Sequence, residues 1–289
     1  MSFNKSVLTP GQSPGPGFRP RGAGNLPGVI KFQKKSIFYT DDGTGKAIVL
    51  LHGFTESSRI WTSLSKQLSK MFRVITIDLP GHGQSDCVNN IHSMELMADV
   101  VFTVLKKLKT GKCLMVGHSL GGFVALAFTE KYPRMIKGFS LFHSHCFADN
   151  SAEQQNRNRT IGIVNQDKFS YVSQFIPSLF PVEVHKKFSK QIERLIQHAS
   201  KMSKEGVIAA LEGMKVRKDQ SELLKTTKLP VLFILGLKDT RVSVARALEM
   251  ICLPAACEIL LLRDCGHMGY IEAPEKIFGA IAGFARKVL

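Results

Sequence analysis

The stretch of sequence that decides the fold is CLMVGHSLGGFVAL, residues 113–126. An unbroken apolar run of strand length leads directly into a glycine-rich turn, and apolar residues at helical spacing follow. The centre of the stretch, residues 117–121, fits the pattern G-x-S-x-G, in which a serine occupies a sharp, strained turn between a strand and a helix. Glycine is needed two residues to either side, because a Cβ atom there would collide with the neighbouring strand or helix. The pattern therefore predicts that the hydroxyl of Ser119 points out of the sheet.

Short apolar runs recur on both sides of this turn. They are continuous rather than alternating, which is typical of parallel strands that are buried on both faces. The runs are residues 74–77, 113–116, 139–142, 231–235 and 259–262. Between them, apolar residues spaced by three and four predict amphipathic helices, and a closing helix is predicted over residues 274–289. The sequence therefore predicts an α/β fold, a mostly parallel, doubly wound sheet with helices on its faces.

The chain is expected to enter this sheet through a hairpin. Residues 30–39 and 47–51 have the composition of strands, and the segment DDGTG at residues 41–45 supplies an Asp-Gly turn between them. The preceding residues 1–29 are rich in Gly, Pro and Ser and are basic, which predicts a flexible arm. This arm lacks the continuous apolar stretch of a secretory signal.

The alternation of strands and helices stops after residue 142. Residues 145–228 show only helical patterns, interrupted by Pro177 and Pro181, and contain no run typical of a strand. We interpret this segment as an inserted, all-helical cap. The α/β core is then expected over residues 30–144 and 229–289.

The composition predicts a globular chain without a membrane span. At 289 residues and 44% hydrophobic content the chain can bury a full core, and no window approaches the roughly 18 apolar residues that a spanning helix needs. The formal charge of +16 is spread along the chain. Since no arginine-rich helix or nucleic-acid motif accompanies it, a solvated basic surface and no nucleic-acid partner are expected.

Six cysteines show neither a CxxC pair nor zinc-ligand spacing. Several lie in apolar runs, where a free thiol behaves as a small hydrophobic group. We therefore expect reduced thiols and a cytoplasmic protein. Nothing in the sequence sets the oligomeric state.

The turn at Ser119 needs a base, because a serine hydroxyl is a poor nucleophile at neutral pH. His267 follows the last predicted strand and is the candidate base. Asp239 follows the strand at residues 231–235 and is the candidate for the carboxylate that orients the imidazole. Asp149, beyond the strand at residues 139–142, is the alternative acid. The order Ser, Asp, His along the chain is that of a hydrolase catalytic triad.

Attack on a carbonyl group creates an oxyanion, which backbone N–H groups can stabilise. Two donors are predicted for this oxyanion hole. One is the amide of Leu120, at the start of the helix after the nucleophile, and the other is the amide of Phe54, just after the strand at residues 47–51.

With these motifs in place, the sequence resembles the α/β-hydrolase family, and within it the capped esterases and non-haem peroxidase-like hydrolases. The resemblance covers about residues 36–289 and rests on five ordered blocks, at residues 51–54, 78–85, 117–122, 236–239 and 266–268. It implies an eight-stranded sheet, a lid over the catalytic gorge, and neither a metal nor an organic cofactor. Haloalkane dehalogenases and epoxide hydrolases carry an aspartate at the position of Ser119, so their reactions are not expected here.

Other histidines near these blocks have simpler interpretations. His118, His143 and Met268 are predicted to line the pocket, whereas His52 and His82 are predicted to brace loops. The run HSHC at residues 143–146 superficially resembles a metal site. Because successive residues at a strand end point to opposite sides, no metal is predicted there.

The sequence thus favours an enzyme that cleaves a small carboxylic ester through an acyl-enzyme. One alternative is a C–C bond hydrolase or a lyase of the menaquinone-synthase type, which would recruit arginines such as Arg157, Arg159 or Arg217 for an anionic substrate. The other is a signalling receptor with the same fold that binds a small ligand. An exposed apolar patch on the cap would favour the receptor.

Overall fold

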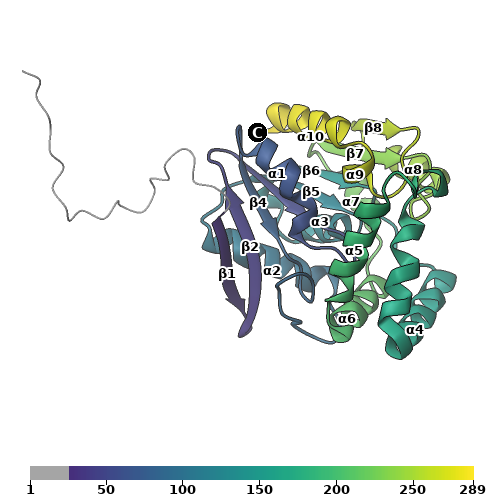
Figure 1. Cartoon of the computed structure of the whole chain (residues 1–289). Coiled ribbons are helices and arrows are strands. Elements are labelled where there is room, and N and C mark those ends of the chain that lie inside the picture. Colours follow the sequence, from purple (N-terminus) through teal and green to yellow (C-terminus); the bar gives the residue numbers. More distant parts are fainter. Residues whose placement is uncertain (1–25) are drawn as a thin grey trace, which may run out of the picture.

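The computed structural model describes residues 26–289 and contains one sheet of eight strands in the order β1-β2-β4-β3-β5-β6-β7-β8 (Figure 1). Strands β3 to β8 are parallel, whereas β2 pairs antiparallel with both β1 and β4. The prediction of a mostly parallel, eight-stranded sheet is therefore confirmed. The strands are β1 Leu26–Phe32, β2 Lys35–Asp42, β3 Ala47–Leu51, β4 Arg73–Ile77, β5 Cys113–His118, β6 Ile136–Phe142, β7 Val231–Gly236 and β8 Glu258–Leu262.

The predicted hairpin at the start of the sheet is wrong. The actual hairpin joins β1 to β2 through Gln33 and Lys34, whose φ angles of 47° and 69° suit a turn that follows the twist of two strands. The segment after β2, with Gly43 at φ +68°, instead carries the chain past β4 to β3. The reason is that β3 pairs in parallel with β4 and β5, which occupy both of its edges and leave none for β2.

The predicted basic arm, residues 1–29, lies almost wholly outside the described residues. Its last residues belong to β1, which begins at Leu26. The core of the sheet therefore starts slightly earlier in the chain than the sequence indicated.

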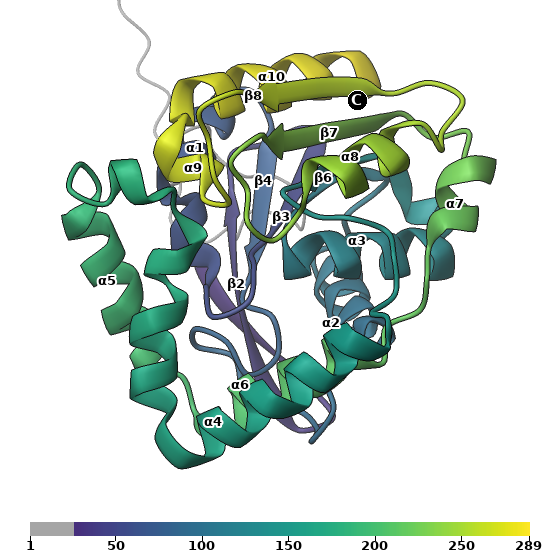
Figure 2. The same cartoon turned by 90° about the vertical axis from the view of Figure 1, so that its right-hand side faces the viewer.

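Helices cover both faces of the sheet. Residues of α2, α3 and α8 pack into one apolar cluster, and residues of α1 and α10 pack into a second cluster on the opposite face (Figures 1 and 2). The predicted closing helix is confirmed as α10, with Ile277, Ile281 and Phe284 buried. The core helices are α1 Thr62–Leu68, α2 Met94–Lys107, α3 Leu120–Lys131, α8 Val244–Ile251, α9 Gly269–Glu272 and α10 Pro274–Val288, with short 3-10 turns η1 Ser58–Trp61 and η2 Pro133–Met135.

All regular structure between β6 and β7 is helical, as the pattern predicted. These inserted helices gather at one side of the sheet (Figures 1 and 2). They are α4 Ser151–Phe175, α5 Ser189–Ser200, α6 Lys204–Lys215 and α7 Ser221–Thr226, with the 3-10 turns η3 Pro177–Leu179 and η4 Val182–Val184. Helix α4 bends at Asp167, whose carboxylate caps its second half by accepting from Ser170 N–H at 2.9 Å. No helix within residues 26–289 has the length and apolar character needed to cross a membrane.

Three buried histidines are expected to make the fold sensitive to acid. Burial lowers the pKa of His82 to about 3 and the pKa values of His92 and His143 to about 4. Their folded pKa values lie below the unfolded value of about 6.5, so their stabilising effect is present above that pH and is lost as the pH falls. We expect the free energy of unfolding to fall by roughly 3 to 5 kcal/mol between pH 6.5 and about pH 5.

Urea unfolding at the two pH values measures this drop. A His82→Gln protein removes one of these titrating groups and is expected to show a drop smaller by roughly 1 to 2 kcal/mol. An equal drop in the variant would contradict the assignment.

Candidate active site

The turn between β5 and α3 has the strained geometry that the sequence predicted. Ser119 has φ 50° and ψ −113°, and its N–H donates to Phe142 O at 2.9 Å. A Cβ atom on Gly117 would lie 2.2 Å from Gly121 O, and one on Gly121 would lie 2.3 Å from Leu51 O. Only glycine at these positions lets helix and strands approach closely enough to hold the serine in this conformation.

Strands β7 and β8 bring an acid and an imidazole together at the same edge of the sheet. His267 Nδ1 lies 2.9 Å from Asp239 Oδ2, and both side chains are buried, at 4% and 1% exposed. Asp239 Oδ1 also accepts from the N–H groups of Arg241 and Val242, at 2.7 and 3.1 Å. With Nδ1 turned to the carboxylate, Nε2 is the nitrogen left for a reacting group. His267 and Ser119 line the same pocket.

The carboxylate of Asp239 is held in its charged form. Burial opposes ionisation, but the neighbouring His267 and His143 outweigh it and hold the pKa of Asp239 well below its usual range. His143 Nδ1 lies 3.1 Å from Asp239 Oδ2, although the contact is too bent for a well-formed hydrogen bond. An ionised carboxylate in this place can fix the tautomer of His267 and stabilise its imidazolium form.

Asp149, the alternative acid, has different partners. Its carboxylate is bound by Arg157 and Arg217, with Arg217 Nη1 2.5 Å from Oδ1. It lines the pocket wall, and no hydrogen bond joins it to His267 in the described part of the chain. The structure therefore brings Asp239 and not Asp149 to the imidazole.

The loop that carries the amide of Phe54 is fixed by His52. His52 Nε2 accepts from Leu79 N–H at 2.9 Å, so Nδ1 carries the proton and donates to Gly53 O at 2.8 Å. This is the bracing role that was predicted for His52. Phe54 lines the pocket, and the N–H of Leu120, the first residue of α3, has no intrahelical acceptor. Both predicted oxyanion donors thus belong to segments beside Ser119.

A sequence model described as the alpha/beta hydrolase fold matches residues 46–274, which is most of the chain. The chain belongs to the α/β-hydrolase family. An uncharacterised protein of Mycobacterium tuberculosis is 38% identical over 94 residues, 32% of this chain and 28% of that protein, so the chain matches under a third of that relative's length.

Two longer similarities cover most of this α/β-hydrolase. A 2-hydroxy-6-oxononadienedioate/2-hydroxy-6-oxononatrienedioate hydrolase of Burkholderia vietnamiensis is 26% identical, covering 87% of this chain and 91% of that protein. The solved structure of a thermophilic esterase from Thermogutta terrifontis is 29% identical, with a TM-score of 0.85 over 92% of this chain and 99% of that chain.

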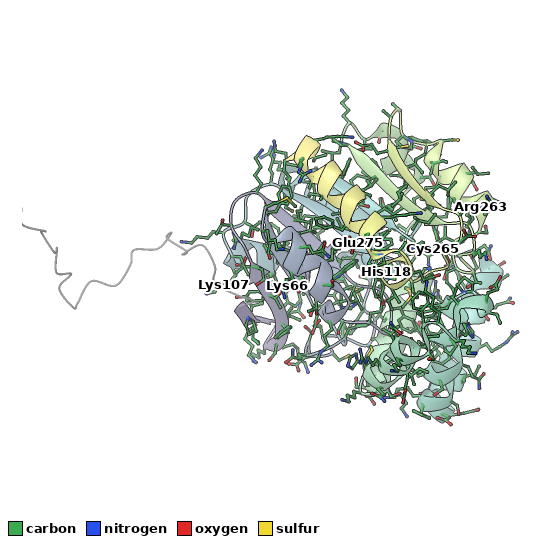
Figure 3. The ribbon with its side chains drawn as sticks, turned by 45° about the horizontal axis from the view of Figure 1, so that its top comes forward. Lys66, Lys107, His118, Arg263, Cys265 and Glu275 are labelled. Carbon is green, nitrogen blue, oxygen red and sulfur yellow. The ribbon has the colours of Figure 1, made fainter. Side chains whose placement is uncertain are left out.

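His118 was predicted to line the pocket, but in this α/β-hydrolase it is buried among the interior side chains (Figure 3). Its Nδ1 is 3.0 Å from Glu56 Oε2 and its Nε2 is 2.9 Å from His267 O. Both ring nitrogens face acceptors, so both carry a proton and the ring is an imidazolium. Burial lowers the pKa of His118, but the charge and hydrogen bond of Glu56 outweigh this and raise it.

Glu56 extends this ion pair to two further loops. Its carboxylate accepts from Gly53 N–H at 2.6 Å and from the Tyr270 hydroxyl at 3.0 Å. The pair of Glu56 and His118 therefore ties together the loop of Phe54, the end of β5 and the loop of His267. Sequence reasoning missed this ion pair because Glu56 and His118 are 62 positions apart and no single motif contains both.

Breaking this pair is expected to destabilise the protein strongly. Glu56→Ala leaves a buried imidazolium without its counter-charge, so the free energy of unfolding should fall by about 3 to 5 kcal/mol in urea. Glu222→Ala is the control, since it breaks a surface pair with Lys225 in which Glu222 is 78% exposed, and should cost less than about 1 kcal/mol. Equal effects of the two substitutions would contradict a charged His118.

The other two predicted pocket residues have different outcomes. His143 lines the pocket, as predicted. The prediction for Met268 is wrong: its side chain is fully buried against the inserted helices, in a cluster with Val172, Ile176 and Leu179. The reason is a local turn, in which Glu272 accepts from the N–H groups of Met268 and Gly266, at 3.0 and 2.9 Å. This turn directs the side chain of Met268 away from the pocket.

His143, Asp239 and His267 also place three metal-binding atoms within 4.8 Å of one another, a set that the sequence did not reveal. The 2.9 Å distance from His267 Nδ1 to the carboxylate suits a hydrogen bond, whereas His143 Nδ1, at 3.1 Å, makes only a bent contact. The geometry therefore fits an acid–base group.

The pocket above Ser119 is bordered by both the core and the inserted helices. Its aromatic walls are Phe54, Phe123, Tyr171 and Phe175. Its charged side chains are Asp149, Glu153, Arg157, Arg241 and Arg246. Ser144, another residue that the sequence did not single out, lines the pocket and donates to Ser119 O at 2.8 Å.

Proposed function

We propose that this α/β-hydrolase is a serine hydrolase that cleaves a small carboxylic ester through an acyl-enzyme. The observation that carries the proposal is the hydrogen-bonded pair of Asp239 and His267, which shares one pocket with Ser119 on its strained turn. The similarity to the Thermogutta terrifontis esterase supports the same reaction class.

The chemistry follows from these positions. Ser119 Oγ attacks the ester carbonyl while His267 Nε2 takes its proton, and the N–H groups of Phe54 and Leu120 stabilise the oxyanion. His267 then gives the proton to the leaving alkoxide. A water activated by His267 attacks the acyl-enzyme, and the acid is released with Ser119 restored. Asp239 keeps the imidazole in the right tautomer throughout.

The inserted helices act in this proposal as the cap over the pocket. Residues of α4, such as Tyr171 and Phe175, and of α6, such as Leu211 and Met214, face the same pocket as the nucleophile. A wall of this kind limits the size and shape of the acyl group and excludes water from the reacting atoms.

A C–C bond hydrolase is the second candidate. The Burkholderia vietnamiensis relative is named as a hydrolase of 2-hydroxy-6-oxononadienedioate, and Arg157, one of the arginines expected for an anionic substrate, lines the pocket. Arg159 is exposed and is not among the lining residues, whereas Arg217 lies against Asp149. A kcat/KM for 2-hydroxy-6-oxononadienedioate that exceeds the value for every ester would favour this candidate.

A ligand receptor is the third candidate, because Phe169 and Val182 of the inserted segment are 60% and 79% exposed.

Fluorophosphonate labelling and ester turnover separate these functions. We expect one label per chain by intact mass, located by peptide mapping on Ser119 and not on Ser144, together with many turnovers of p-nitrophenyl butyrate. One slow turnover would favour the receptor. Absence of labelling would overturn the serine mechanism.

A further inference from the structure

We propose that the pocket contains a second subsite, formed by Arg157 and Arg241, that binds a carboxylate on the substrate, so that the preferred ester is an anion. This inference rests on the proposed ester hydrolysis. It adds a substrate class to a mechanism that by itself accepts any ester.

The inference begins with the balance of charge around the pocket. Four guanidinium groups and three carboxylates lie at its wall or directly behind it, and they are Arg157, Arg217, Arg241, Arg246, Asp149, Glu153 and Asp239. The three acids offset three of the four arginines. One positive charge is left without a counter-charge at the wall.

The most buried of these positive charges lie around Asp149. Arg157 and Arg217 share its single carboxylate, and the Arg217 side chain is only 3% exposed. Arg217 Nη2 is buried without a hydrogen-bond partner among residues 26–289. Its guanidinium lies 4.2 Å from the centre of the Phe123 ring, a favourable contact that supplies no negative charge. Since buried charges in proteins are normally paired, Arg217 draws on the charge of Asp149, and Arg157 is left only partly neutralised.

The second acid is already fully engaged. Glu153 lies 2.7 Å from Arg246 Nη1 and also accepts from Asn150 N–H at 2.8 Å to cap α4. Asp219, on the far side of Arg217, accepts from the backbone N–H groups of Ala148 and Ser221 and does not line the pocket. Glu153 is therefore paired with Arg246, and the charge of Asp219 acts on Arg217 from outside the pocket.

Arg241 has no carboxylate partner in the described part of the chain. Its guanidinium lies 5.1 Å from the centre of the Phe175 ring and donates to Ser178 Oγ at 2.5 Å, which leaves most of its donors unused. The nearby Asp239 is committed to His267. Arg241 thus presents an unpaired cation at the wall of the pocket that holds Ser119.

His145 lines the same pocket and lies near the same arginines. Burial, followed by the charges of Arg217, Arg246 and Arg157, holds the pKa of His145 well below its ordinary value. The imidazole is therefore neutral at physiological pH and adds no charge of its own to the pocket wall.

A carboxylate suits this subsite better than a neutral polar group. The planar guanidinium fork matches two carboxylate oxygens, and such charged hydrogen bonds are stronger than neutral ones. A half-ester of a dicarboxylic acid would place its ester carbonyl at Ser119 and its free carboxylate at Arg157 and Arg241. The pocket then receives the negative charge that its own residues lack.

The test compares two p-nitrophenyl esters of similar shape. One is the hemiadipate, which carries a carboxylate, and the other is the isooctanoate, in which an isopropyl group replaces it. We expect the ratio of kcat/KM values, hemiadipate over isooctanoate, to fall roughly 10- to 100-fold in Arg241→Met and in Arg157→Met. Arg157→Met leaves Asp149 paired with Arg217, so it does not create an orphaned acid.

Two controls accompany this comparison. Arg241→Lys keeps the charge and should retain most of the preference, and Arg194→Met removes an exposed arginine of α5 and should leave the ratio unchanged. A ratio near one in the wild type, or an unchanged ratio in both Met variants, would overturn the subsite.

Binding measurements separate this inference from the proposed function. Calorimetry of adipate with the Ser119→Ala protein tests the subsite without catalysis, and binding should weaken when Arg241→Met is added. If neither ester is hydrolysed but adipate binds in an Arg241-dependent way, ester hydrolysis fails and the anion subsite stands. If esters are hydrolysed and adipate does not bind, the subsite fails alone.

Discussion

Replacing Ser119 with alanine is expected to lower kcat for the best ester by about 10⁴- to 10⁶-fold while changing KM little. The substitution removes the only atom that forms the acyl-enzyme. It leaves the amides of Phe54 and Leu120 and the walls of the pocket in place, so the substrate still binds. The residual rate would come from water attack assisted by the oxyanion donors.

The fold should survive this substitution. The strain at φ 50° and ψ −113° is imposed by the close contacts of Gly117 and Gly121, which an alanine at position 119 does not alter. Far-ultraviolet circular dichroism and the melting temperature should therefore stay close to wild type. Ser189→Ala, at an exposed position of α5, is the control and should keep full activity. Retention of a tenth of wild-type kcat by Ser119→Ala would rule out a serine nucleophile.

The turn at Ser119 could be predicted in detail because its cause is local. The strand, the two glycines and the helix are contiguous in sequence, and the collisions that exclude a Cβ atom involve Gly117, Gly121 and the adjacent strand β3. Asp239 and His267 could be assigned for a related reason. Each follows a parallel strand, and the carboxyl ends of neighbouring parallel strands lie at the same edge of a sheet.

The features that the sequence did not predict depend on contacts between distant segments. Glu56 meets His118 only after β3 and β5 have paired, and Asp149 meets Arg217 only after the inserted helices have folded back on the core. The error at the first hairpin has the same origin. An Asp-Gly turn after β2 is a local signal, but the pairing of β3 with the distant strands β4 and β5 occupies both of its edges.

Asp239→Asn is the second change with a very large expected effect, a loss of about 10⁴-fold in kcat. The surroundings decide which way the amide turns. Oδ1 of Asp239 accepts from the N–H groups of Arg241 and Val242, so the asparagine oxygen must take this position and its NH₂ group must replace Oδ2. The NH₂ group then faces His267 Nδ1, 2.9 Å away, and competes with the retained oxygen, 3.0 Å from the same nitrogen, to make Nδ1 an acceptor.

In the tautomer with Nδ1 as acceptor, the proton of His267 lies on Nε2, the nitrogen that has to accept the proton of Ser119. The imidazole is then in the wrong tautomer to act as a base, although the shape of the site is unchanged. Steady-state kinetics with p-nitrophenyl butyrate measure the loss, and Asp264→Asn, an exposed acid in the same loop, is the control that should stay near wild type. A fall of less than tenfold in Asp239→Asn would mean that another group orients His267. Since Asp149 is bound to Arg157 and Arg217, it is not free to take that role without breaking both ion pairs.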